Sequence, residues 1–203
     1  MKWKPYHQKQ EYINMKIAFT GNPTYGVAEA WNKTIYHHFT DFFSRNNGWD
    51  LDLPRKRREF AKHIVEYDVF INSSALYHFH QVNLLKDVFE HWDNIGKSGR
   101  IINIGSTADR NNKATSWVYP TEKKALKEFS LSLSQRGIWE NHPIKVSYIS
   151  FGSLQTKAVN KKHPDRTLMS LEKVCNVIES VLKQDEDNLI SEYRIDPIQK
   201  NNN

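Results

Sequence analysis

The sequence predicts an α/β protein: a doubly wound parallel sheet with helices on both faces, in a Rossmann-like three-layer α/β/α arrangement. Short runs of β-branched and aromatic residues alternate along the chain with helical stretches of roughly 10–18 residues, which is typical of right-handed βαβ units. The first strand also runs directly into a glycine turn and a helix. The 203 residues suffice for one domain with a substantial core. We expect this domain to span 15–198, with a flexible extension at 1–14 and a disordered tail at 199–203.

The individual elements follow from local pattern. Each expected strand is a short apolar run, and "YDVFINSSA" at 67–75 is the clearest buried example. The helices are predicted from apolar residues three to four apart, as in "GVAEAWNKTI". Asp52 is the expected N-cap of the second helix, with Pro54 in its first turn, and Gly137 is expected to close the fourth helix. The expected strands occupy 15–21, 40–45, 67–75, 98–106, 144–152 and 188–195, and the expected helices occupy 26–39, 55–66, 79–92, 119–137 and 170–184.

Composition narrows the class of protein. Hydrophobic residues make up 38% of the chain, the mean hydropathy is −0.71, and no apolar run approaches the roughly 18 residues that a membrane span needs. The N-terminal stretch is polar and lacks the apolar segment of a signal peptide. Cys175, the single cysteine, has no internal disulfide partner, and its apolar neighbours at helical spacing predict core packing. We therefore expect a cytoplasmic protein.

The excess of positive charge raises the question of nucleic acid. The net charge is +6, and basic residues concentrate only in "RKRR" at 55–58 and in the stretch 157–166. No zinc-ligand spacing, RNP-type aromatic motif or helix-turn-helix signal accompanies them. The run at 55–58 is expected to coat an exposed helix start. A basic surface also suits an enzyme that binds polyphosphate cofactors, so nucleic-acid binding is the minor alternative.

The turn after the first strand has the form of an anion site. Gly21 ends the strand and Gly26 begins the helix, so backbone N–H groups and the helix dipole can face a pyrophosphate. The alternative is an ordinary connection between a strand and a helix, which glycine spacing alone does not exclude. A dinucleotide fold requires such a turn at the first strand of the sheet, and the turn lies there.

Four motifs in the same order resemble those of the short-chain dehydrogenase/reductase family. "TGNPTYGVA" resembles its Thr-Gly-x-x-x-Gly-x-Gly turn, with one inserted residue and Ala28 in place of the last glycine. "INSSA" resembles its Asn-Asn-Ala-Gly strand end and keeps Asn72, and "GRIINIGS" matches the strand that delivers the catalytic serine. "ISFGSLQT" resembles its Pro-Gly-x-x-x-Thr segment, with Phe151 for proline but Gly152 and Thr156 correctly spaced. The resemblance extends from about residue 15 to residue 196.

Tyr119 and Lys123 are the candidate proton-transfer pair. They are four residues apart at a helix start and so share a face, where an ammonium group can stabilise a phenolate. Chance supplies about one such pair, and Tyr12 with Lys16 is another. Ser106 lies thirteen residues before Tyr119, the separation common in the family, whereas counting back from Tyr12 leaves the chain.

The resemblance implies a role for each member of this set. Tyr119 is then the general acid/base, Ser106 orients and polarises the carbonyl group, and Lys123 binds the nicotinamide ribose and lowers the tyrosine pKa. The alternative is a solvated helix start with a surface lysine. A side-chain amide on a helix is expected to complete a proton relay. Asn83 and Gln81 are both candidates, and the sequence does not decide between them.

The end of the second strand indicates the cofactor. It reads "SRNN" rather than ending in Asp or Glu, so Arg45 can pair with a 2′-phosphate with help from Ser44, and NADP(H) is predicted over NAD(H). The alternative is a solvated loop arginine. By resemblance, Asp50 meets the adenine amino group. The cofactor-binding residues that the resemblance implies are Gly21, Asn22, Tyr25, Gly26, Val27, Ser44, Arg45, Asp50, Leu51, Asn72, Ser73, Ser74, Gly152, Leu154 and Thr156.

The substrate is predicted only as a small-molecule carbonyl or alcohol. His78, His80, Trp117 and Phe151 are candidate pocket residues, the basic stretch after Thr156 is the expected substrate loop, and no metal site is expected. The resemblance further implies a homodimer or homotetramer. The leading prediction is an NADP(H)-dependent carbonyl reductase or alcohol dehydrogenase. The alternative on the same fold is a non-catalytic NAD(P)-binding sensor, which the altered glycine turn and Phe151 favour.

Overall fold

A computed structural model describes residues 14–35, 38–74, 76–110, 118–156, 166–184 and 187–198. The expected extension at 1–14, except Asn14, and the expected tail at 199–203 lie outside the described residues. The strands are β1 Lys16–Thr20, β2 Phe39–Phe43, β3 Val69–Asn72, β4 Gly99–Ile104, β5 Ile144–Phe151 and β6 Glu192–Ile195. The helices are α1 Gly26–Thr34, α2 Pro54–His63, α3 His80–Asn94, α4 Val118–Trp139 and α6 Leu171–Leu182, with 3₁₀ turns η1 Arg45–Asn47, η2 Ile64–Glu66 and η3 Thr107–Arg110.

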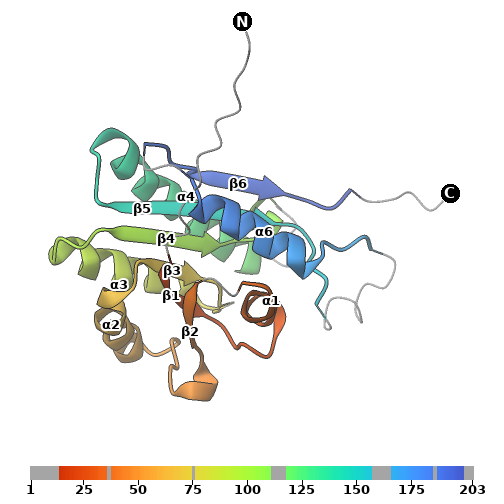
Figure 1. The fold of residues 1–203 in the computed structure, drawn as a ribbon, viewed down its shortest axis with the longest axis horizontal. Coiled ribbons are helices and arrows are strands. Elements are labelled where there is room, and N and C mark those ends of the chain that lie inside the picture. Colours follow the sequence, from red (N-terminus) through yellow and green to blue (C-terminus); the bar gives the residue numbers. More distant parts are fainter. Residues whose placement is uncertain are drawn as a thin grey trace, which may run out of the picture.

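The sheet has six strands in the order β2-β1-β3-β4-β5-β6, and all neighbouring strands are parallel. Helices α1 and α6 pack together on one face, and α2, α3 and α4 cover the other (Figure 1). The predicted doubly wound, three-layer fold is therefore confirmed. The order of strands reverses at β1, with β2 on one side and β3 on the other, and a ligand crevice is expected at that point.

Alternation along the strands builds two cores. In β1, Ile17 and Phe19 face α1 and α6, whereas Ala18 faces α2 and α3. Trp31 of α1 and Trp92 of α3 are fully buried, one on each side of the sheet. Burial of each large apolar side chain contributes about 1.5–3 kcal/mol. The carboxyl ends of the strands are therefore held at fixed positions by packing on both faces.

Two local predictions were wrong, and a third, the exposed basic run at 55–58, was wrong at Arg57 while Arg55 and Arg58 are exposed. Asp52 is not the N-cap of α2, because Leu53 occupies that position and Pro54 is the first helical residue. Gly137 does not end α4, which continues to Trp139, and a Cβ at this buried glycine would lie 3.2 Å from the Leu189 side chain. Arg57 of the basic run at 55–58 is buried. Its guanidinium pairs with Asp87 at 3.1 Å and donates to the carbonyl groups of Leu51 and Asp52.

None of the helices in the described ranges is both long and apolar enough to cross a membrane.

Candidate active site

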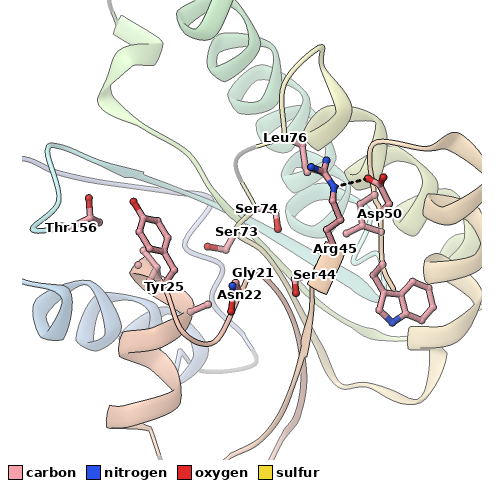
Figure 2. Close-up of a pocket in the computed structure, with 15 residues that line it drawn as sticks. Gly21, Asn22, Tyr25, Ser44, Arg45, Asp50, Ser73, Ser74, Leu76 and Thr156 are labelled. Atoms are coloured by element: carbon pink, nitrogen blue, oxygen red, sulfur yellow. Dashed lines mark hydrogen bonds and ion pairs between the residues drawn. The ribbon is translucent and has the colours of Figure 1, made fainter. Parts of the chain in front are cut away.

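A cavity of about 390 Å³ opens at the carboxyl ends of β1, β2 and β3, at the expected crevice. Tyr25 and Thr156 lie toward one end of it, and Arg45 and Asp50 toward the other (Figure 2). Twelve of the fifteen residues predicted to bind the cofactor line this cavity: Gly21, Asn22, Tyr25, Gly26, Val27, Ser44, Arg45, Asp50, Leu51, Ser73, Ser74 and Thr156.

The glycine turn forms the floor of the cavity. Gly21 has φ +154°, and a Cβ there would lie 2.9 Å from the Ala28 Cβ, so only glycine lets α1 approach the end of β1 so closely. Asn22 shapes the turn because its Oδ1 accepts from the backbone N–H of Thr24 at 3.0 Å. The first residue of α1 is Gly26, which also lines the cavity, so the N–H groups of the first helical turn are available to an anion.

The neighbouring strand end is tied to the same turn. The backbone N–H groups of Ser73 and Ser74, which follow β3, donate to Thr20 Oγ1 at 3.0 and 3.3 Å. Thr20 is the last residue of β1 and donates in turn to the Ile71 carbonyl at 3.3 Å. These bonds hold the two strand ends on either side of the crevice at a fixed separation.

The far end of the cavity carries a cluster of charges. Arg45 pairs through Nε with Asp50 Oδ1 at 3.2 Å, which is the dashed contact in Figure 2, and through Nη2 with Asp52. Asp52 also contacts His80 Nδ1 at 3.0 Å. The expected pocket residue His80 therefore belongs to this charged cluster. Arg45 itself remains exposed on the cavity wall.

Sequence reasoning missed three lining residues: Ala28, Trp49 and Leu76. The Trp49 ring packs edge-on against Phe43 and Phe60. Trp49 directly precedes the predicted residue Asp50, and that position is the signal that could have identified it as a lining residue. Leu76 follows a strand end and carried no signal of its own.

The three residues of the predicted proton-transfer set lie close together near the carboxyl end of β4, and none of them lines the cavity. Ser106 follows β4, and Tyr119 and Lys123 lie in the first two turns of α4. The Lys123 Nζ lies 5.6 Å from the centroid of the Tyr119 ring. Burial raises the pKa of Tyr119 above its ordinary value, although the residue remains 37% exposed, and its hydrogen bond with Ser106 acts in the opposite direction.

Lys123 is buried, with 6% of its surface exposed. Its Nζ donates to Gln81 Oε1 at 2.6 Å and to the Ile104 carbonyl at 3.5 Å. Burial lowers the pKa of Lys123 to about 8, with the neighbouring carboxylate of Glu122 opposing the shift. The ammonium form is therefore held by neutral acceptors and loses its proton more readily than a surface lysine.

Gln81 joins the lysine to the sheet. Its Nε2 donates to the carbonyls of Asn72 at 2.9 Å and Ile104 at 3.1 Å, while Asn72 Nδ2 donates to Asn103 Oδ1 at 2.9 Å. Of the two amides left open by the sequence, Gln81 reaches Lys123, and Asn83 is half-buried further along α3. Asn72 lies within this network and does not line the cavity.

The turn before α3 has an unusual backbone. His78 and Phe79 have φ of +56° and +60°, a left-handed conformation that costs non-glycine residues about 1–2 kcal/mol each. The Phe79 N–H donates to Glu122 Oε1 at 3.2 Å, which fastens the turn to α4 beside Lys123. Tyr77, in the same turn, is close enough to Tyr119 to raise its pKa.

The remaining predicted residues lie elsewhere. Phe151 is 2% exposed and packs in the core under α1 and α6, so it is not a pocket residue. Leu154 forms an isolated parallel bridge with Met169, and a Cβ on Gly152 would lie 2.6 Å from Asp196 Oδ1. Trp117 and the expected substrate loop at 157–165 fall outside the described residues. Within the described part of the chain, no three His, Cys, Asp or Glu side chains gather in a group that suits a metal.

Comparison with known proteins agrees with this geometry. The solved structures similar to this one include a short chain dehydrogenase from Burkholderia cenocepacia J2315 in complex with NADP (13% identity, 91% of this chain and 89% of that one, TM-score 0.71). They also include a 4-hydroxyisoleucine dehydrogenase complexed with NADH (18% identity, 90% and 97%, TM-score 0.72) and serine dehydrogenase from Escherichia coli (16% identity, 89% and 97%, TM-score 0.65). At these identities the structures establish a shared fold.

The family itself is established by sequence. No curated protein sequence matches this chain directly. The sequence model of the short chain dehydrogenase family, however, matches residues 56–167, more than half of the chain. That span includes β3, α3, β4, α4 and β5, and so contains Ser106, Tyr119 and Lys123. The chain therefore belongs to the short chain dehydrogenase family and is an NAD(P)-dependent oxidoreductase that acts on CH–OH or C=O groups.

Proposed function

We propose that this protein is an NADP(H)-dependent carbonyl reductase or alcohol dehydrogenase in which Ser106, Tyr119 and Lys123 carry out proton transfer. The observation that carries the proposal is the buried Lys123 ammonium, 5.6 Å from the ring of a tyrosine that is hydrogen-bonded to Ser106. A solvated surface lysine would need neither burial nor a specific acceptor, whereas this one is 6% exposed and bonded to Gln81 at 2.6 Å.

Each residue has a distinct task in this proposal. Tyr119 donates its hydroxyl proton to the carbonyl oxygen as negative charge develops there, and takes a proton back in the oxidation direction. Ser106 donates a hydrogen bond to the same oxygen and fixes its position. The positive charge of Lys123 stabilises the Tyr119 phenolate, which burial otherwise disfavours.

The cavity fits a dinucleotide, which supplies the hydride when bound. The turn at Gly21 leaves no room for a Cβ, and the backbone N–H groups of Gly26 and Val27 would hold a pyrophosphate at the start of α1. Asp50, Leu51 and Trp49 would enclose the adenine. Lys123, which does not line the cavity, would bind the nicotinamide ribose, as the family resemblance implies.

The preference for NADP(H) is supported by Arg45 and Ser44 on the cavity wall. A 2′-phosphate must compete with Asp50 and Asp52 for the Arg45 guanidinium, because both carboxylates already pair with it. The test is fluorescence titration of the protein with NADPH and with NADH. We expect tighter binding of NADPH and loss of that difference in Arg45→Gln, and equal affinities in the unmodified protein would contradict the preference.

The catalytic proposal is tested by turnover. Absorbance of NADPH at 340 nm is followed over a panel of aldehydes, ketones and quinones, with Tyr119→Phe as the test variant and Tyr193→Phe, on β6, as the matched control. We expect turnover that is lost in Tyr119→Phe and kept in Tyr193→Phe. Binding of NADPH without turnover of any compound would instead support the non-catalytic sensor.

We also propose a homodimer or homotetramer in the cytoplasm. Exposed apolar side chains at the ends of α3 and α4 support self-association: Ile95, Ile138 and Trp139 are 52, 45 and 80% exposed. Light scattering after size-exclusion chromatography would show a monomer if this is wrong. Cys175 supports a reducing compartment, since it is a buried free thiol whose pKa burial raises to about 11. Fractionation of cells that express the protein tests this location.

A further inference from the structure

A buried polar cluster lies directly behind Ser106 and takes no part in the proton-transfer set. It consists of Asp109 in η3 and Tyr148 and Ser150 in β5. Tyr148 and Ser150 have no exposed surface, and the Asp109 side chain is fully buried. Three polar side chains in such a place are costly unless their hydrogen bonds are made.

The hydrogen bonds of this cluster converge on the backbone of Ser106. The Ser106 N–H donates to the Tyr148 hydroxyl oxygen at 3.4 Å, and that hydroxyl donates to Asp109 Oδ2 at 3.1 Å. Ser150 Oγ donates to the same carboxylate oxygen at 3.3 Å. The Asp109 N–H closes the loop by donating to the Ser106 carbonyl at 2.9 Å. Asp109 thus holds the turn after β4 directly and through Tyr148.

The end of β4 is shaped to admit the phenol. A Cβ on Gly105 would lie 2.0 Å from the Tyr148 hydroxyl oxygen, so no other residue at 105 is compatible with the ring in this position. Tyr148 is also close enough to Tyr119 for the charges of the two hydroxyl groups to interact. The sequence therefore places a second tyrosine next to the reacting one.

Tyr148 has no exposed surface, so its hydroxyl cannot reach a substrate as a proton donor. Burial and the Asp109 carboxylate together raise its pKa well above the ordinary range, so the phenol keeps its proton and directs it at Asp109. The charge of Asp109 is balanced by Arg110, whose Nε lies 3.6 Å from Oδ1 and whose Nη2 pairs with Asp196 at 2.7 Å. The cluster is therefore suited to fix the conformation of the turn that carries Ser106.

We propose that Tyr148, oriented by Asp109, is a positioning residue that fixes the direction of the Ser106 side chain toward Tyr119 and the carbonyl oxygen. The inference rests on the proposed function of Ser106. Replacement of Tyr148 by phenylalanine removes the acceptor of the Ser106 N–H and the donor to Asp109, and keeps the ring. Loss of one hydrogen bond of about 1 kcal/mol corresponds to roughly a fivefold effect.

A double-mutant cycle tests this role. Turnover of NADPH with the best carbonyl compound of the panel is measured for Ser106→Ala, Tyr148→Phe and the double variant, with NADPH affinity by fluorescence. We expect Tyr148→Phe to lower kcat about fivefold at unchanged NADPH affinity. In the Ser106→Ala background the same change should have no further effect, because the side chain that it positions is gone. A merely structural role would make the two effects multiply.

Substitutions at Asp109 provide a second route if Tyr148→Phe folds poorly. Asp109→Asn keeps an acceptor for the Tyr148 hydroxyl and should retain most of the turnover, whereas Asp109→Leu should behave like Tyr148→Phe. Ser150→Ala is the control, since it removes the other donor to Asp109 and should leave kcat within about twofold. Thermal melts confirm that each variant is folded.

The outcomes separate the two proposals. Unchanged turnover in Ser106→Ala overturns the proposed function and the inference with it. A loss in Ser106→Ala together with unchanged kcat in Tyr148→Phe, or with multiplying effects in the double variant, overturns the positioning role alone.

Discussion

The bond between Gln81 and Lys123 should control the pH dependence of the reaction. Gln81→Leu keeps most of the side-chain volume but removes the acceptor that lies 2.6 Å from the Lys123 Nζ. A hydrogen bond to a charged group contributes about 1.5–3 kcal/mol, and each pKa unit corresponds to about 1.4 kcal/mol. The pKa of Lys123, already lowered to about 8 by burial, should therefore fall by a further one to two units.

The assay is the pH dependence of kcat/KM for reduction, which reports ionisations of the free enzyme. Stabilisation of the phenolate requires the ammonium form, so wild-type activity should decline as the pH rises through about 8. In Gln81→Leu the decline should begin about one to two units lower. Gln81→Glu should move it upward, because a carboxylate stabilises the ammonium group.

Two results would refute this reasoning. The first is a decline at the same pH in the wild type, Gln81→Leu and Gln81→Glu. The second is a Lys123→Met variant that is active and keeps the alkaline decline, since the decline would then belong to another group. Gln81→Leu also removes the Gln81 donor to the carbonyls of Asn72 and Ile104, so its profile is recorded below its own melting temperature.

Further predictions concern stability and cofactor binding. Folding lowers the pKa of Lys123 from 10.5 to about 8, so the unfolded chain binds more protons between these values, and the free energy of unfolding should rise with pH from about 8 to 10. Urea unfolding should show this rise in the wild type, and an equal rise in Lys123→Met would contradict it. Gly21→Ala should weaken NADPH binding at least about tenfold, because the new Cβ meets Ala28 and an L-residue is strained at a φ of +154°; undiminished binding in Gly21→Ala would refute this. Asp52→Asn should tighten NADPH binding severalfold relative to NADH binding, because one carboxylate no longer competes with the 2′-phosphate for Arg45. An unchanged ratio of the two dissociation constants in titrations would show that the Arg45–Asp52 pair does not affect cofactor preference.

Much of the fold is readable in the sequence because its signals are local. Apolar runs and three-to-four spacing mark the elements, and the glycines at 21 and 26 mark where strand becomes helix. The proximity of Ser106, Tyr119 and Lys123 is also readable, since Ser106 closely follows a strand while Tyr119 and Lys123 share a helix face. Their proximity follows from one strand, one helix and the thirteen-residue separation between Ser106 and Tyr119.

The side-chain contacts that the sequence did not predict join residues that are far apart in the chain. Gln81 and Lys123 are 42 residues apart in the sequence, so the sequence alone did not show whether Gln81 or Asn83 would reach the lysine. Asp52 has the type and place of an N-cap, but an ion pair with Arg45 and a contact with His80 Nδ1 compete for its carboxylate.

Charge and hydrophobicity also mislead at two buried positions. Arg57 sits in a basic run that resembles a solvated surface, yet Asp87 on the next helix and two carbonyl groups satisfy it in the interior. Tyr148 in a buried strand is indistinguishable from a core aromatic residue until its hydroxyl is seen between Ser106 and Asp109.

The left-handed turn at His78 and Phe79 joins backbone strain to the support of Lys123. Glycine at either position would relieve a backbone conformation that L-residues disfavour, for a gain of about 1 kcal/mol. Selection of this protein for heat resistance alone should therefore enrich substitutions in this turn. The same turn donates the Phe79 N–H to Glu122 and leads directly into Gln81, so the strained conformation also fixes where the support of Lys123 begins.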